Sequence, residues 1–215
     1  METFIKTLIY IHAFFGGLGL TAGIVSIVVR KGGKVHKLWG KIFSYGMIIS
    51  SLLSLIVACM PHHENSFLFL IGIFTIYMVL AGNRALTLKA SIKKSADAID
   101  KSISYTMSFI ALLMIGFGVY CLINDNNLWT LYWFFGGIAL YMTYRDFKTF
   151  KTFKTFTTNN KIAIVSHIGR MVGAFITSIT AFLVAGLSIS NLIVWLAPTL
   201  LGIPYIIYWT RKMKS

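Results

Sequence analysis

Three ionisable side chains lie inside long apolar stretches of this sequence: His12, His167 and Arg170. An ionisable group within a membrane-spanning helix is costly and is a functional candidate by default. A neutral imidazole is a common ligand of haem iron and of metal ions, whereas a guanidinium binds carboxylates and phosphates. These residue types predict a redox centre with haem b or a transition metal, or a site for a quinone or an anionic headgroup.

A polar layer is expected where several ionisable residues come to similar depths near one membrane boundary. Its members are His36, Arg84, Asp100, Asp146, His167 and Arg170. In one interpretation the layer is a collar of ion pairs, in which Arg170 or Arg84 pairs with Asp100 or Asp146. In the other it binds an anionic headgroup, a quinone or a metal ion. The cofactor-binding candidates are then His12, His36, Arg84, His167 and Arg170.

A second group of candidate ligands lies near the opposite boundary, at Cys59, Met60, His62 and His63. Thiolate, thioether and imidazole groups suit copper or zinc, so this group predicts a soft-metal site. Cys121 is expected near the same boundary, which makes a disulfide an alternative. The third interpretation is two isolated, buried thiols beside a polar turn.

The positions of the carboxylates indicate whether the protein could be an ion-coupled transporter. All six are predicted at helix ends or in connections: Glu2, Glu64, Asp97, Asp100, Asp125 and Asp146. Ion-coupled transporters usually bind their proton or sodium ion at a carboxylate within the membrane. The sequence therefore argues against secondary transport.

The composition indicates which elements must hold these residues. Of 215 residues, 57% are hydrophobic and 12% are charged, and the mean hydropathy is +0.76, whereas soluble proteins average about 25% charged residues. Apolar runs long enough to cross a membrane as helices cover residues 4–29, 42–60, 66–86, 104–123, 128–144, 162–187 and 190–209. We therefore predict an all-α fold, a polytopic transmembrane bundle of seven helices that forms a single domain over residues 1–215.

The basic residues set the orientation of this bundle. The first, third and fifth connections carry five Lys or Arg residues each and the C-terminal tail carries three, which accounts for 18 of the 20. The opposite connections carry none. Since basic connections stay in the cytoplasm, the N-terminus is predicted outside and the C-terminus inside. Orientation and anionic lipid headgroups then explain the net charge of +14, and nucleic acid is not expected as a partner.

Small and polar residues predict the inward faces of two helices, because bulky apolar side chains turn toward lipid. In the first helix this face is His12, Gly16, Gly19, Gly23 and Ser26. In the sixth it is Ser166, Arg170, Gly173, Thr177 and Thr180. The lipid-facing side of the sixth helix is predicted to be Ile164, Ile168, Val172, Phe175, Ile179 and Phe182. A Phe-Lys-Thr repeat over residues 147–155 is interpreted as a cytoplasmic extension of the fifth helix, or as a docking segment.

Several motifs resemble a family of uncharacterised bacterial multi-pass membrane proteins, and together they span nearly the whole chain. The first is a helix-one histidine, here His12, which precedes a connection that reads KGGKVHKLWGKIF over residues 31–43. Other matches are YMVLAGNRA at 77–85, HIGRM at 167–171 and WLAPT at 195–199. The resemblance implies a bacterial cytoplasmic membrane and makes His12, His36, Arg84, His167 and Arg170 the family-pattern positions. Lys37 stands where relatives often have arginine, and the family implies no activity.

Two classes of function follow from the sequence. The first is a redox or metal protein, in which inward histidines ligate haem b or a metal ion. His12 is expected roughly 12 Å below the outer end of its helix and His167 near the cytoplasmic end of another, so one haem would fit this pair poorly. The second is a non-catalytic membrane subunit that binds lipid headgroups or a partner protein through the cytoplasmic-side layer of Arg, His and Asp residues. A membrane partner or a second copy of the chain is possible in this class. The sequence does not decide whether the protein is an enzyme.

Overall fold

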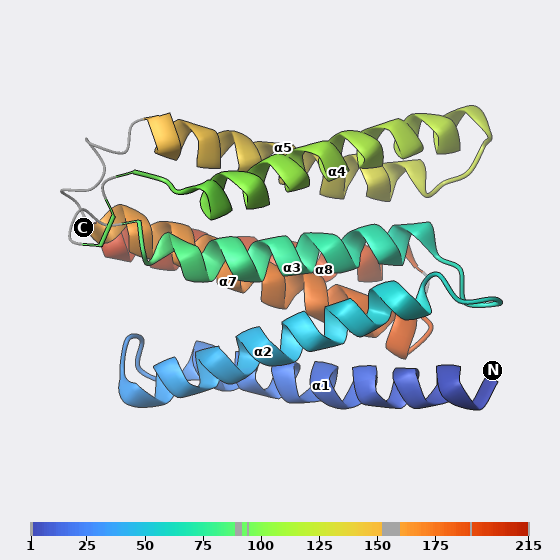
Figure 1. Ribbon diagram of the computed structural model, residues 1–215, viewed down its shortest axis with the longest axis horizontal. Coiled ribbons are helices and arrows are strands. Elements are labelled where there is room, and N and C mark those ends of the chain that lie inside the picture. The colour runs from blue at the N-terminus through green and yellow to red at the C-terminus, as the bar shows by residue number, and fades with distance from the viewer. Residues whose placement is uncertain (1, 89–91, 94, 152–159, 190, 215) are drawn as a thin grey trace. The chain divides into compact units, whose positions relative to one another are not determined.

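The computed structural model describes residues 2–88, 92–93, 95–151, 160–189 and 191–214. Helices make up 85% of it, and these ranges hold no strand. The helices are α1 (Glu2–Val28), α2 (Lys34–Val57), α3 (Ser66–Ala85), α4 (Ala98–Ile123), α5 (Trp129–Lys151), α7 (Asn160–Ala181), the π-helix η1 (Phe182–Gly186) and α8 (Leu192–Lys214) (Figure 1). The prediction of an all-α fold with seven α-helices is therefore confirmed for the described ranges.

Six of these helices are long and apolar enough to cross a membrane, as expected of a multi-pass membrane protein. They are α1, α2, α3, α4, α8 and the continuous segment Lys161–Gly186, which joins α7 to η1. The exception among the described residues is α5, whose last two turns carry Arg145, Asp146, Lys148 and Lys151. These charges lower its mean hydropathy, although its first four turns are apolar.

Several helices are longer than their apolar runs predict, which corrects the expected positions of two carboxylates. The helix α4 begins at Ala98 instead of residue 104, because Asp97 and Asp100 form a reciprocal capping box at its N-terminus. The helix α5 continues to Lys151 instead of ending near residue 144. Asp146 therefore lies within a helix, and both Asp100 and Asp146 are buried. The prediction that Asp146 follows the fifth helix is therefore wrong, although Asp146 lies close to the C-terminal end of α5.

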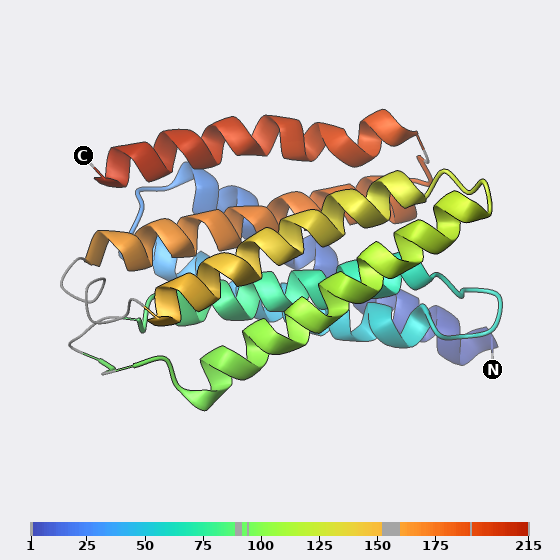
Figure 2. The same cartoon turned by 90° about the horizontal axis from the view of Figure 1, so that it is seen from above.

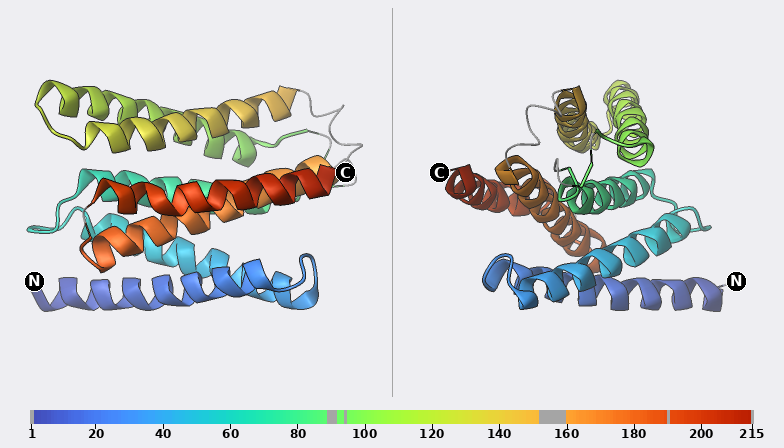
Figure 3. Two further views of the ribbon diagram at one scale, coloured as in Figure 1. Left: turned by 180° about the vertical axis from the view of Figure 1, so that it is seen from behind. Right: turned by 60° about the vertical axis from the view of Figure 1, so that its left-hand side comes forward.

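The chain divides into two compact units. Unit 1 comprises Met1–Val79 and Gly173–Leu200, and unit 2 comprises Leu80–Val172 and Leu201–Ser215. Three helices, α3, α7 and α8, therefore contribute residues to both units. Figure 3 shows α8 as one uninterrupted helix.

In unit 1, α1 and α2 form an antiparallel hairpin packed along the predicted inward face of α1 (Figure 1). A Cβ atom placed at Gly46 of α2 would lie 3.1 Å from Gly19 Cα and 3.0 Å from the carbonyl oxygen of Phe15. A Cβ atom at Gly19 would overlap Met47 Cε. The backbones thus approach closely because these positions lack side chains, which confirms the inward face predicted for α1.

One predicted lipid-facing residue of α7 is instead part of unit 1's interior. The ring of Phe175 lies 6.2 Å from that of Phe43, centroid to centroid, in an edge-to-face arrangement. It also occupies the space beside Gly23, where a Cβ atom would come within 2.5 Å of its ring. The missing side chain at Gly23 makes room for this ring, so the outward assignment of Phe175 is wrong. Thr177 and Thr180, predicted to face inward, are buried.

In unit 2, α4 and α5 form the second antiparallel hairpin (Figure 2). Their register follows from contacts along the pair. Near the turn, Phe117 stacks on Tyr132 with ring centroids 6.0 Å apart. At the other end, Tyr105 lies 4.8 Å from Phe147. The two helices therefore run alongside each other over most of their lengths.

Candidate functional site

The predicted ion pairs of the polar layer form in unit 2, and the first group gathers where α3 ends and α4 begins. Arg84 Nε donates to Asp100 Oδ1 at 2.5 Å, and one terminal nitrogen of Arg84 donates to both carboxylate oxygens of Asp97 at 2.7 Å. Lys93, in the connection between the helices, contacts Asp97 and Asp100 at 2.8 Å each. Two cations and two carboxylates thus tie the end of α3 to the start of α4.

The capping box explains why Asp97 and Asp100 are held in this geometry. The backbone N–H of Asp100 donates to Asp97 Oδ1 at 2.9 Å, and the backbone N–H of Asp97 donates to Asp100 Oδ2 at 3.1 Å. The hydrogen bond from Lys93, the backbone N–H of Asp100 and the Arg84 guanidinium together hold the pKa of Asp97 well below its usual 3.8.

This lowered pKa predicts acid sensitivity. Because the pKa of Asp97 is lower in the folded state, its contribution to stability is fully present above about pH 4 and is lost as the pH falls toward the folded-state pKa. We expect Asp97→Asn to flatten the decrease in melting temperature of the detergent-purified protein below about pH 4. Asp125→Asn, in the α4–α5 turn, is the matched control and should leave that decrease unchanged. Equal curves for wild type and Asp97→Asn would contradict the assignment.

A second ion pair joins α5 to α7. Arg170 donates to Asp146 Oδ1 and to the hydroxyl of Ser166, one turn earlier on α7. Ser104 of α4 donates to the other oxygen of Asp146 at 2.9 Å. Only 6% of the Arg170 side chain and 11% of the Asp146 side chain are exposed. Arg170 thus has the anionic partner that a guanidinium requires inside an apolar bundle.

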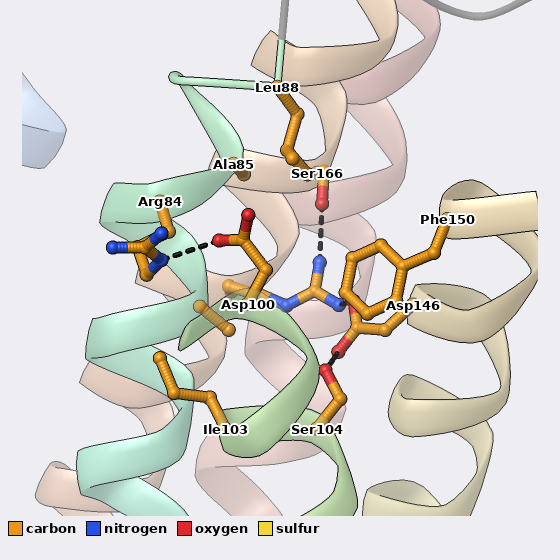
Figure 4. Close-up of a pocket in the computed structure, with 11 residues that line it drawn as sticks. Arg84, Ala85, Leu88, Asp100, Ile103, Ser104, Asp146, Phe150 and Ser166 are labelled. Carbon is orange, nitrogen blue, oxygen red and sulfur yellow. Dashed lines mark hydrogen bonds and ion pairs between the residues drawn. The ribbon is translucent and has the colours of Figure 1, made fainter. Parts of the chain in front are cut away.

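The two groups of ion pairs face each other across a small cavity (Figure 4). Polar groups of Arg84, Asp100, Ser104, Asp146, Ser166 and Arg170 line it. Ile103, Leu88 and the ring of Phe150 lie among its apolar boundaries. Its volume is about 20 Å³, which is room for about one water molecule. A quinone, a porphyrin or a phospholipid headgroup does not fit in this space.

Among the described residues, the ion pairs beside the cavity join equal numbers of cations and carboxylates. Three cations, Arg84, Lys93 and Arg170, are paired with three carboxylates, Asp97, Asp100 and Asp146. An anion would have to displace a carboxylate from its guanidinium to bind here. The geometry therefore agrees with a collar of ion pairs between α3, α4, α5 and α7.

His167, a predicted member of the layer, does not line the cavity. Its Nδ1 donates to the backbone carbonyl of Gly82 on α3 at 2.9 Å. A Cβ atom at Gly82 would lie 2.8 Å from Met171 Sδ and 3.1 Å from Arg170 Cβ. This close approach of α3 and α7 brings the carbonyl within reach of the imidazole.

His12, in unit 1, contacts α2. Its Nδ1 donates to the backbone carbonyl of Ser50 at 2.8 Å, and the Ser50 hydroxyl donates to the backbone carbonyl of His12 at 3.1 Å. The side chain is half-buried. His12 therefore faces into unit 1, as predicted, and helps to join the two helices of the hairpin.

His36, in unit 1, lies at the opposite end of the hairpin and caps α1. Its Nδ1 donates to the carbonyl of Ser26 at 3.1 Å. Lys31 Nζ donates to the same carbonyl at 3.1 Å and also contacts the carbonyls of Ile27 and Val29. Burial lowers the pKa of Lys31. These two side chains satisfy carbonyl groups at the C-terminus of α1 that have no partner within the helix.

A haem does not fit between these histidines within either unit. Along α1, the 14 residues from His12 to Ser26 correspond to about 21 Å, so His12 and His36 cannot ligate opposite faces of one iron. The α1–α2 contact at Gly19 and the α3–α7 contact at Gly82 leave no gap for a porphyrin. The structure describes His12 and His167 within different units.

The predicted soft-metal group has no geometric support. Cys59 and Cys121 are both free thiols. Cys121 is buried as predicted, but the predicted burial of Cys59 is wrong, because Cys59 is exposed. No three His, Cys, Asp or Glu side chains gather as a metal site would require within the described ranges. His62 lies in the left-handed region of backbone conformation, with φ of 64°. The group at Cys59, Met60, His62 and His63 therefore looks like a polar turn with a thiol beside it.

Four members of the unit 2 network were not among the predicted site residues: Lys93, Asp97, Ser104 and Ser166. The spacing of Asp97 and Asp100 before an apolar run is that of a capping box and could have indicated the true start of α4. Ser104 follows Asp100 by four residues, which places both on one face of the helix. Comparison with known proteins adds no assignment, because no family model, curated protein or solved structure matches this chain.

Proposed function

We propose that the chain crosses the bacterial cytoplasmic membrane seven times, with the N-terminus outside and the C-terminus in the cytoplasm. Six of these crossings are the helices that are long and apolar enough to span a membrane, and the remaining crossing is α5. The register of α5 against α4 supports the assignment of α5 as a crossing. Tyr132 and Asp146 of α5 lie opposite Phe117 and Ser104 of α4. Since α4 is long and apolar enough to span a membrane, a helix paired with it over this length reaches both sides.

Reporter fusions test this topology. Fusions after Asn65 and Asn126 should report the outside, and fusions after Leu88, Lys161 and Ser215 should report the cytoplasm, because basic connections are retained there. The decisive pair is Asn126 and Lys161, which flank α5. Signals from the same side at both positions would mean that α5 does not cross.

For the activity, we propose that the protein is a non-catalytic membrane subunit that binds lipid headgroups, a membrane partner or a second copy of itself on its cytoplasmic side. The observation that carries this is the network of ion pairs in unit 2, which lines a space for about one water molecule. In this proposal the network holds four helices together at the cytoplasmic boundary. Ligand binding is then left to other groups on that side.

A redox or metal protein is the second candidate, and one specific observation favours it. The imidazoles of His12, His36 and His167 each donate from Nδ1 to a backbone carbonyl. Histidines that ligate metals or haem iron through Nε2 are usually oriented in this way. In this alternative, Nε2 of one of these rings binds haem b or a transition metal.

An absorption spectrum and a metal analysis of the purified protein separate the two candidates. The non-catalytic proposal expects a colourless, metal-free protein that shows no saturable spectral change when haem b is added. A Soret band at one haem per chain, or one metal ion per chain, would overturn it in favour of the second candidate. Loss of that signal in one of His12→Ala, His36→Ala or His167→Ala would then identify the ligand.

A further inference from the structure

The tip of the α1–α2 hairpin in unit 1 carries four exposed cations: Arg30, Lys34, Lys37 and Lys41. None of the four makes an ion pair or a side-chain hydrogen bond within the described residues. In unit 2, by contrast, Arg84, Lys93 and Arg170 are all paired with carboxylates. The hairpin tip is therefore a concentrated positive charge without a counter-charge of its own.

Unit 1 has no carboxylate near the hairpin tip that could pair with these cations. Its two acidic residues are Glu2, at the start of α1, and Glu64, in the connection after α2. Both lie at the far end of the antiparallel hairpin. The other polar side chains at the tip, Lys31 and His36, are directed to the carbonyls that end α1. The four exposed cations are thus distinct from the capping residues beside them.

The order of the exposed residues along α2 indicates how deep in the membrane these cations lie. Lys34, Lys41, Tyr45 and Leu52 follow one another at spacings of seven, four and seven, which places them on one face of the helix. Tyr45 is 68% exposed and Leu52 is 50% exposed. Tyrosine is enriched at the membrane interface and leucine in the hydrocarbon region. The order along this face therefore places Lys34, Lys37 and Lys41 at the level of the headgroups.

We propose that Arg30, Lys34, Lys37 and Lys41 form a binding surface for the phosphate groups of anionic phospholipids in the cytoplasmic leaflet. The proposal rests on the topology proposed above and names the residues that contact lipid. Lys37 and Lys41 lie three and seven residues after Lys34, so the three ammonium groups share one side of α2. Mutual repulsion among the four charges favours an anionic partner, and the negative surface of this leaflet supplies one.

The test measures retained lipid. The full-length protein, delipidated in a neutral detergent, is titrated with phosphatidylglycerol or with phosphatidylcholine, and bound lipid is counted by native mass spectrometry. Wild type should bind phosphatidylglycerol in preference to phosphatidylcholine, and the affinity should fall as salt is raised. The variant Arg30→Gln, Lys34→Gln, Lys37→Gln, Lys41→Gln should lose about 1,000-fold in affinity for phosphatidylglycerol.

The matched control removes four exposed cations of unit 2: Lys101→Gln, Lys148→Gln, Lys151→Gln, Lys161→Gln. Its net charge equals that of the hairpin variant, and we expect it to retain most of its phosphatidylglycerol affinity. Equal losses in the two variants, or no loss in the hairpin variant, would overturn the proposal. The reporter fusions separate this outcome from a failure of the topology. A hairpin tip on the outside would refute the cytoplasmic assignment even if the lipid affinities behaved as expected.

Discussion

Replacement of Arg170 by methionine should destabilise the protein by about 3–5 kcal/mol. The side chain keeps a comparable length but loses its charge, so the buried carboxylate of Asp146 loses the guanidinium that donates to it. A buried carboxylate without a cationic partner is costly. The measurement is the midpoint of unfolding of the detergent-purified protein.

The double variant Arg170→Met, Asp146→Asn tests the cause of this loss. Removing both charges of a buried pair costs much less than removing one, so the double variant should recover a large part of the lost stability. Arg145→Met is the matched control, because Arg145 is an exposed neighbour of Asp146 on α5. It should cost less than about 1 kcal/mol. A double variant no more stable than Arg170→Met alone would show that Arg170 does more than pair with Asp146.

The ion pairs of unit 2 were predictable because few carboxylates could form them. Asp100 and Asp146 are the acidic residues nearest in depth to Arg84 and Arg170, so the pairing of these arginines with these carboxylates follows from their charges and depths. The position of Asp146 inside α5 was not predictable from hydropathy. Arg145, Asp146 and Lys148 end the apolar run, but the helix continues because its ends need not be apolar.

The role of His36 illustrates a second limit of the sequence. Its side chain was a cofactor-binding candidate, but in the structure it caps α1 together with Lys31. This capping depends on how the chain turns between two helices, and Gly32, with φ of 76°, allows that turn. The division into two units was equally hidden, because α3, α7 and α8 pass through both without a break in their apolar pattern.

The inward face of α1 was predictable, since three glycines recur between His12 and Ser26 at helical spacing. What the sequence could not provide was the identity of the surface against it. Gly46 and Met47 of α2 meet Gly19, and the aromatic rings of Phe43 and Phe175 fill the space at Gly23. Close packing of this kind leaves little room for adjustment, because the nearest atoms include backbone.

Gly19→Leu should therefore destabilise the protein by about 3 kcal/mol, because its side chain must enter a filled contact. A Cβ atom at this position would overlap Met47 Cε and lie 3.4 Å from the backbone nitrogen of Met47. Movement of the flexible Met47 side chain could relieve the first contact, but a leucine also needs space where α2 itself lies. Gly17→Leu is the matched control on the same helix, since a Cβ atom there meets nothing within 4 Å. Thermal unfolding of both variants in detergent measures the difference. If the two variants melted at the same temperature, the close α1–α2 contact could not be what stabilises unit 1.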